Sequence, residues 1–131
     1  LMAAVLEQRG DAGVSWLEQH YLQRADRTDA EVQAALLALR VHATDGRRID
    51  KDAATRALRR FVKAQPMRAG YAASDLGDWG RWDFVPAFEQ ALDTDRPQVF
   101  ASRYAVVLYL LRNPTPEAKA ALERLRAKGR L

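Results

Sequence analysis

The sequence predicts an all-α protein, folded as an α-solenoid (a superhelix) of about four antiparallel helical hairpins. Apolar residues recur three and four positions apart along nearly the whole chain, which is the spacing of amphipathic helices. Caps and breakers divide the 131 residues into eight helical segments. Anchor positions in successive hairpins recur at intervals in the thirties, which is typical of helical repeats. A compact multi-helix bundle is the structural alternative. The hairpins are expected over about residues 1–24, 28–65, 67–94 and 97–128.

The first hairpin pairs two short helices. One covers about residues 1–9 and ends at Gly10, and the other begins with Asp11 as its cap and continues to about Gln23. The inward-facing residues of the second helix are expected to be Val14, Leu17, Tyr21 and Leu22.

The second hairpin has the clearest start signals. Thr28 and Glu31 form a capping box, in which each side chain binds the free backbone N–H of the other residue. This helix is expected to end at the turn over residues 45–46. Asp50 then caps the next helix, which ends before Pro66. The expected core residues are Val32, Ala35, Leu36, Leu39 and Ala43, followed by Ala54, Leu58, Phe61 and Val62.

The third hairpin begins with a helix over about residues 67–78. Asp83 is expected to cap the next helix, which places Pro86 at the third helical position, where its missing N–H breaks no internal bond. The expected anchors are Tyr71, Leu76, Val85, Phe88 and Leu92.

The fourth hairpin starts with a helix over about residues 97–112. Residues 113–114, Asn-Pro, break it, and Thr115, Pro116 and Glu117 then supply an N-cap, a first-position proline and a favourable helix-dipole charge. The expected core residues are Phe100, Tyr104, Val107, Leu108 and Leu111, followed by Ala118, Ala121, Leu122 and Leu125.

The segment over residues 101–125 resembles a HEAT-type repeat. It has an apolar first helix, a short polar turn and a second helix with leucines on one face. It is similar to terminal units of HEAT-like regions in large bacterial proteins of uncharacterised function. The clear match covers about one unit, and the usual turn Asp and following basic residue are not all in place, so the likeness is to a divergent repeat. The resemblance implies a scaffold for protein interaction that carries no catalytic residues. From the helical rhythm we expect a single repeat domain over residues 1–131, and because the chain opens inside an amphipathic pattern we expect it to be a fragment of a longer protein.

The composition excludes several kinds of chemistry. The absence of cysteine rules out disulfide scaffolds, Cys-based zinc sites, iron–sulfur clusters and thiol nucleophiles. His20 and His42 stand alone, without metal-ligand spacing, and no phosphate-binding loop is present. The longest apolar run, residues 104–111, is too short to span a membrane. We therefore expect no enzyme activity, no cofactor, no metal and no membrane insertion.

A tryptophan-rich loop is one candidate binding element. Asp78, Trp79, Arg81 and Trp82 lie within one inter-helix turn, and Trp and Arg dominate interface hot spots. The alternative, which we favour, is that the two Trp side chains plug the junction between hairpins while the Asp residues cap helices.

A basic stripe is the other candidate. Arg56, Arg59, Arg60 and Lys63 share one face of a helix, and Lys119 and Arg126 on the last helix could extend it into a positive groove. Such a groove would suit an acidic protein segment or a phosphate backbone. A solvated helix face is the simpler alternative.

These features predict a monomeric, non-catalytic module for protein–protein interaction. The net charge of +4 keeps a second function open, namely nucleic-acid binding through a basic concave face, as in DNA glycosylases with a HEAT-like fold. A purely architectural spacer is the third possibility.

Overall fold

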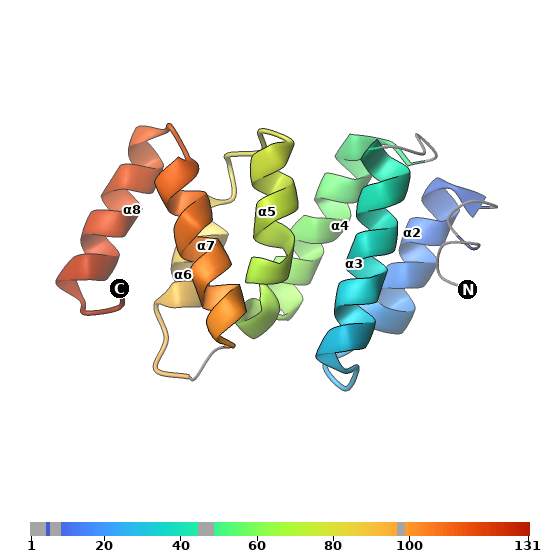
Figure 1. Cartoon of the computed structure of the whole chain (residues 1–131), viewed down its shortest axis with the longest axis horizontal. Coiled ribbons are helices and arrows are strands. Elements are labelled where there is room, and N and C mark those ends of the chain that lie inside the picture. The colour runs from blue at the N-terminus through green and yellow to red at the C-terminus, as the bar shows by residue number, and fades with distance from the viewer. Residues whose placement is uncertain (1–4, 6–8, 45–48, 97–98) are drawn as a thin grey trace. The chain divides into compact units, whose positions relative to one another are not determined.

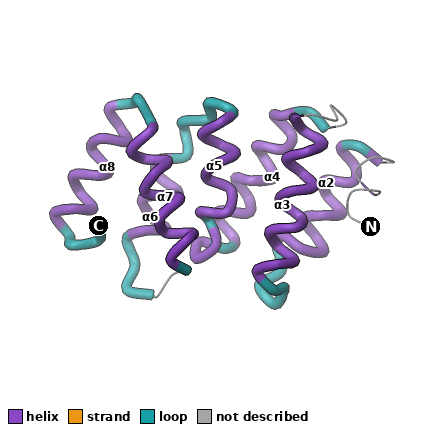
Figure 2. Tube along the Cα trace, viewed as in Figure 1, coloured by secondary structure: helices purple, strands orange, loops and turns teal. Residues whose placement is uncertain are grey.

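Helices form all the regular structure of the part of the chain that is described. The computed structural model describes residues 5, 9–44, 49–96 and 99–131 (Figure 1). Within these residues there are seven α-helices, one π-helical segment and one 3₁₀ turn, and no strand (Figure 2). None of the helices described is long and apolar enough to cross a membrane. The predicted all-α class is therefore confirmed.

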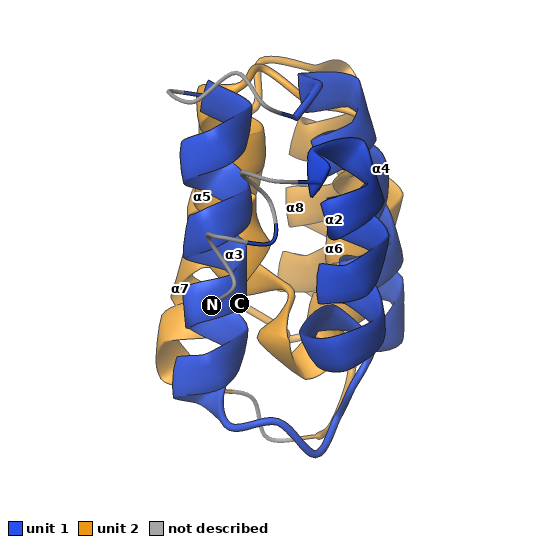
Figure 3. Ribbon diagram, turned by 90° about the vertical axis from the view of Figure 1, so that its right-hand side faces the viewer, with its two compact units in different colours: residues 1–64 blue, residues 65–131 orange. Residues whose placement is uncertain are grey.

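The chain divides into two compact units, residues 1–64 and 65–131 (Figure 3). Each is described by itself below. The predicted first helix lies largely outside the described residues, as does the predicted turn over residues 45–46.

In the first unit, α2 (Asp11–Leu17) continues directly into the π-helical segment η1 (Glu18–Leu22). The predicted cap is wrong, because Asp11 is the first residue of the helix and Gly10 is the cap. Gly10 has a φ of 57°, a conformation that glycine adopts without the steric penalty of a side chain. Tyr21, a predicted core residue, is only half-buried.

The second hairpin matches its prediction closely. In α3 (Asp29–Thr44) the capping box is formed, since the Thr28 N–H donates to the Glu31 carboxylate at 3.0 Å and the Glu31 N–H donates to Thr28 Oγ1 at 3.1 Å. All nine core residues predicted for α3 and α4 (Lys51–Ala64) are buried. The helix α4 packs against both α2 and α3.

The second unit contains α5 (Gly70–Asp78), α6 (Val85–Leu92), α7 (Phe100–Arg112) and α8 (Pro116–Ala127). It has two layers, because α5 packs on α7 while α6 packs on α8 (Figures 1 and 3). The predicted start of the helix near residue 67 is wrong, because a 3₁₀ turn, η2 (Pro66–Arg68), precedes α5. Phe84, and not Asp83, is the cap of α6.

A close approach sets the spacing of α5 and α7. The Gly70 N–H donates to the Ser102 hydroxyl oxygen at 2.9 Å, and a Cβ at position 70 would lie 2.5 Å from the Cα of Ser102. Position 70 therefore requires glycine at this crossing. The face of α7 that carries Ser102 is therefore the face that packs on α5.

The predicted core face of α7 is consequently wrong. The buried residues are Ser102, Val106, Tyr109 and Leu110. The exposed ones are Phe100, Tyr104, Leu108 and Leu111, whereas Val107 is half-buried. The helix is apolar on almost every side, so periodicity cannot select the core face, and packing against α5 selects it instead. The N-cap of α8 is as predicted, with Thr115 Oγ1 accepting from the Ala118 N–H at 3.3 Å.

Candidate functional site

The basic stripe predicted on α4 is exposed, and one of its members, Arg60, forms an ion pair with Glu18. Arg60 donates two hydrogen bonds to the Glu18 carboxylate, from Nε at 2.6 Å and from NH2 at 2.9 Å. This paired carboxylate raises the pKa of the Arg60 guanidinium. The Glu18 side chain is only 11% exposed, so the pair ties α4 to η1 and neutralises a nearly buried charge. Arg56, Arg59 and Lys63 are the other exposed basic residues of this face.

We expect the Arg60→Ala substitution to lower the free energy of unfolding by about 1 kcal/mol, because it strands the Glu18 carboxylate. The expected loss is modest because the Arg60 side chain is 55% exposed and water screens the pair. Urea denaturation measures it, with the exposed Arg56→Ala as the matched control, whose change stays within about 0.5 kcal/mol. Equal losses in the two variants would contradict a structural role for Arg60.

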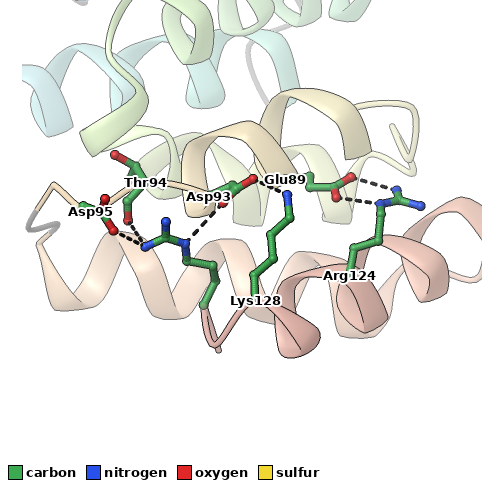
Figure 4. A network of polar contacts seen from close by, with 7 residues as sticks. Glu89, Asp93, Thr94, Asp95, Arg124 and Lys128 are labelled. Atoms are coloured by element: carbon green, nitrogen blue, oxygen red, sulfur yellow. Dashed lines mark hydrogen bonds and ion pairs between the residues drawn. The ribbon is translucent and has the colours of Figure 1, made fainter.

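The basic residues of α8 and its C-terminal end are of two kinds, exposed ones with no ion pair among the described residues and ones paired with acidic residues of α6 or its end. Lys119 and Arg126 are exposed, whereas Arg124 forms a two-bond ion pair with Glu89 of α6, both bonds at 2.8 Å (Figure 4). Lys128 donates to Asp93 at 2.6 Å. These ion pairs join α8 to α6. The stripes on α4 and α8 belong to different units, so the continuous groove stays a prediction.

The Glu89–Arg124 pair gives the second unit an expected pH dependence. The hydrogen bond from Arg124 lowers the pKa of Glu89 below its ordinary value of 4.5. The carboxylate therefore stabilises the folded state fully above about pH 4.5, and this stabilisation is lost as the pH falls through the lowered pKa. We expect the stability difference between the wild-type protein and Glu89→Gln to be constant near neutral pH and to shrink below about pH 4.5.

Urea denaturation across this pH range measures that difference. Arg124→Gln removes the same pair from the other side and should show the same pH dependence. If the free energy of unfolding of Glu89→Gln runs parallel to that of the wild-type protein down to acid pH, the Glu89–Arg124 pair is not the source of the pH dependence.

The tryptophan-rich loop between α5 and α6 is fixed by hydrogen bonds to Tyr109 of α7 and to Asn113, which follows α7. The Tyr109 hydroxyl donates to the Arg81 carbonyl oxygen at 2.6 Å and accepts from the Phe84 N–H at 3.2 Å. Asn113 Nδ2 donates to the Trp82 carbonyl oxygen at 2.9 Å, and the Trp82 and Tyr109 rings lie 5.3 Å apart. These contacts favour a structural role for the loop at the junction of two hairpins.

The contacts of Asp78 and Trp79 also favour a structural role for the loop. Asp78 forms an ion pair with Arg112 at 3.2 Å instead of capping a helix, and the Arg112 guanidinium lies over the Trp82 ring at 5.8 Å. Trp79 is half-buried and ends α5. The structure thus brings Asp78 and Trp82 together through Arg112, on a surface that also borders a cavity of about 630 Å³ lined by Trp82.

An exposed apolar face on α7 is the feature that the sequence did not identify as a site. Phe100, Tyr104, Leu108 and Leu111 are 79%, 57%, 38% and 61% exposed, and we call these four residues the α7 stripe. Their spacing places them along one side of the helix, and the Phe100 and Tyr104 rings stack at 6.2 Å. The sequence of α7 did contain a signal for this face, because a helix that is apolar on every side is either fully buried or covered by a partner.

A cavity of about 470 Å³ lies at the end of the α7 stripe, at the turn between α7 and α8. Leu111 belongs to both the stripe and the cavity, and Lys119, a residue of the predicted basic surface, also lines the cavity. The structure thus brings one predicted binding residue next to the unpredicted apolar face.

The histidines are engaged within their own helices. His20 Nδ1 lies 2.9 Å from the Trp16 carbonyl oxygen, and His42 Nδ1 lies 3.0 Å from that of Ala38. Among the residues that the structure describes, no three His, Asp or Glu side chains gather as metal ligands would.

No protein-family model, curated protein or solved structure matches this chain.

Proposed function

We propose that this protein is a non-catalytic protein-binding module, and that the α7 stripe receives the apolar face of an amphipathic helix from a partner protein. The observation that carries the proposal is the exposure of four large apolar side chains along one side of α7. Contiguous apolar surface of this kind marks interaction sites in folded proteins. The two aromatic residues, Phe100 and Tyr104, provide the large contact area that binding hot spots require.

Charge decides which partner is expected. The only charged side chains on α7 are Arg103 and Arg112, and the charge of Arg112 is offset by Asp78. Arg103, which donates to a backbone carbonyl oxygen, and Lys119, which lines the same cavity as Leu111, therefore provide the positive charge near the stripe. A second copy of the chain would bring like charges together at this contact, which is unfavourable. A helix with an apolar face and acidic flanks complements both the stripe and its surroundings.

We also propose that the fold is a divergent HEAT-like solenoid. Its support is the packing inside each unit, where α2 contacts α4, α5 contacts α7, and α6 contacts α8. Helices of equivalent position in successive hairpins thus lie side by side, as the stacking of hairpins in a solenoid requires. Such solenoids present extended binding surfaces, which agrees with a scaffold function.

Nucleic-acid binding is the rival, and the observation in its favour is the exposed basic face of α4, formed by Arg56, Arg59 and Lys63. A gel-retardation titration with duplex DNA at several salt concentrations tests it. Tight binding with a steep salt slope, weakened by an Arg56→Ala/Arg59→Ala double substitution, would support the rival over the proposal.

A displayed library of helical peptides tests the proposal itself. The library varies large apolar residues on one side of the helix and acidic, basic or neutral residues on its flanks, and the full chain is the bait. We expect enrichment of peptides with an apolar face and acidic flanks. Enrichment of basic peptides, or no enrichment above a bait-free control, would overturn the proposal.

A further inference from the structure

We propose that the cavity at the α7–α8 turn is an anchor pocket, which takes one large apolar side chain of the bound helix while Lys119 pairs with a neighbouring carboxylate of that helix. The inference rests on the proposed function, because Leu111 belongs to both the α7 stripe and this cavity. The anchor pocket would set the specificity for the partner helix, because it requires a bulky apolar residue with an Asp or Glu beside it.

The lining of the cavity is suited to an apolar side chain. Its volume of about 470 Å³ exceeds what one Leu, Phe or Trp side chain needs, so an anchor can enter together with part of its backbone. Most of the lining is apolar, and the two prolines offer no backbone N–H to a ligand. The apolar lining residues are Leu110, Leu111, Pro114, Pro116 and Leu122.

The polar side chains of the lining are already engaged, with one exception. The Thr115 N–H and hydroxyl both donate to Asn113 Oδ1, at 3.0 and 2.8 Å, and Asn113 Nδ2 donates to the Trp82 carbonyl oxygen. The Thr115 hydroxyl oxygen also accepts from the N–H of Ala118. Among the described residues, the Lys119 ammonium has no hydrogen bond or ion pair, and its side chain is exposed.

A ligand for this cavity therefore combines an apolar group with a negative charge. A carboxylate on a helix, next to a protruding apolar residue, supplies both in a fixed geometry. A flat anionic membrane fits less well, because a cavity accepts a protruding side chain and a flat surface offers none.

The test repeats the peptide selection with two variants of the full chain. With Lys119→Glu as bait, we expect one position beside the bulky apolar residue to change from acidic to basic, and peptides from the wild-type selection to bind about fivefold more weakly. With Leu122→Trp, which puts a larger side chain into the lining and narrows the cavity, we expect the preference at the anchor position to shift to smaller apolar residues. Arg126→Glu, one heptad from Lys119 and outside the cavity lining, should leave the selected peptides unchanged.

The outcomes separate this inference from the proposed function. If Tyr104→Glu abolishes peptide binding while Lys119→Glu and Leu122→Trp select the same peptides as the wild type, the α7 stripe binds helices and the anchor pocket is overturned. If Tyr104→Glu leaves binding intact, the proposed function fails. Binding of the full chain to phosphatidylserine vesicles that is lost in Lys119→Glu would overturn the inference in favour of a lipid ligand. Circular dichroism confirms that each variant is folded.

Discussion

The Gly70→Ala substitution is expected to lower the free energy of unfolding of the second unit by about 3 kcal/mol. The added Cβ would lie 2.5 Å from both the Cα and the carbonyl carbon of Ser102. These are backbone atoms of α7, so no side-chain rotation relieves the overlap. The helices α5 and α7 must separate, which also stretches the hydrogen bond from the Gly70 N–H to the Ser102 hydroxyl.

Gly77→Ala is the matched control for this prediction, because Gly77 lies in the same helix. The nearest atom to its added Cβ is a terminal nitrogen of the Arg112 side chain at 3.0 Å, which can move away. Alanine also favours the helix by up to about 1 kcal/mol over glycine, so we expect little net change. Urea denaturation followed by circular dichroism measures both variants. A Gly70→Ala protein as stable as Gly77→Ala would show that α5 and α7 do not cross where described.

The Tyr109→Phe substitution is expected to cost about 2 kcal/mol. The substitution removes the Tyr109 hydroxyl. The Arg81 carbonyl oxygen and the Phe84 N–H, both in the α5–α6 loop, then lose their hydrogen bonds to it. The ring packing against Phe88, with centroids 4.7 Å apart, is kept. The loss should therefore come from the hydrogen bonds and appear as faster amide hydrogen exchange at residues 81–84.

Tyr104→Phe is the control for Tyr109→Phe, since it deletes the same hydroxyl from the same helix at an exposed position. Its change should stay within about 0.5 kcal/mol. If both variants lose the same stability, or if exchange at the α5–α6 loop is unaltered in Tyr109→Phe, the loop is not held by α7 in the way the hydrogen bonds indicate.

The success of the sequence prediction depended on how narrow the apolar stripe of each helix is. The helix α4 alternates clearly between charged and apolar sides, so its core residues Leu58 and Phe61 follow from periodicity. The helix α7 is apolar nearly all round, and the approach of Gly70 to Ser102 decides its buried face. These two residues are 32 positions apart, and no local pattern reports their contact.

The candidate site was predictable to a similar extent. Helical spacing finds the exposed basic face of α4, but it cannot find the partner of Arg60, because Glu18 lies 42 positions away. The α7 stripe was hidden because large apolar residues are assigned to the core by default. Lys119 was identified by its charge, whereas the cavity beside it exists only once α7 and α8 pack against each other.

The most direct test compares two variants in one binding assay, of which one introduces charge into the α7 stripe and the other reverses the charge of the basic face of α4. The Tyr104→Glu/Leu108→Glu variant disrupts the α7 stripe, and the Arg56→Glu/Lys63→Glu variant disrupts the basic face of α4; both change only surface positions. Binding of the peptides selected by the wild-type protein is measured by calorimetry. We expect the first variant to lose binding at least tenfold while the second binds within about twofold of the wild type. Loss of binding in the α4 variant with full binding in the α7 variant would contradict the proposal that the α7 stripe is the recognition surface.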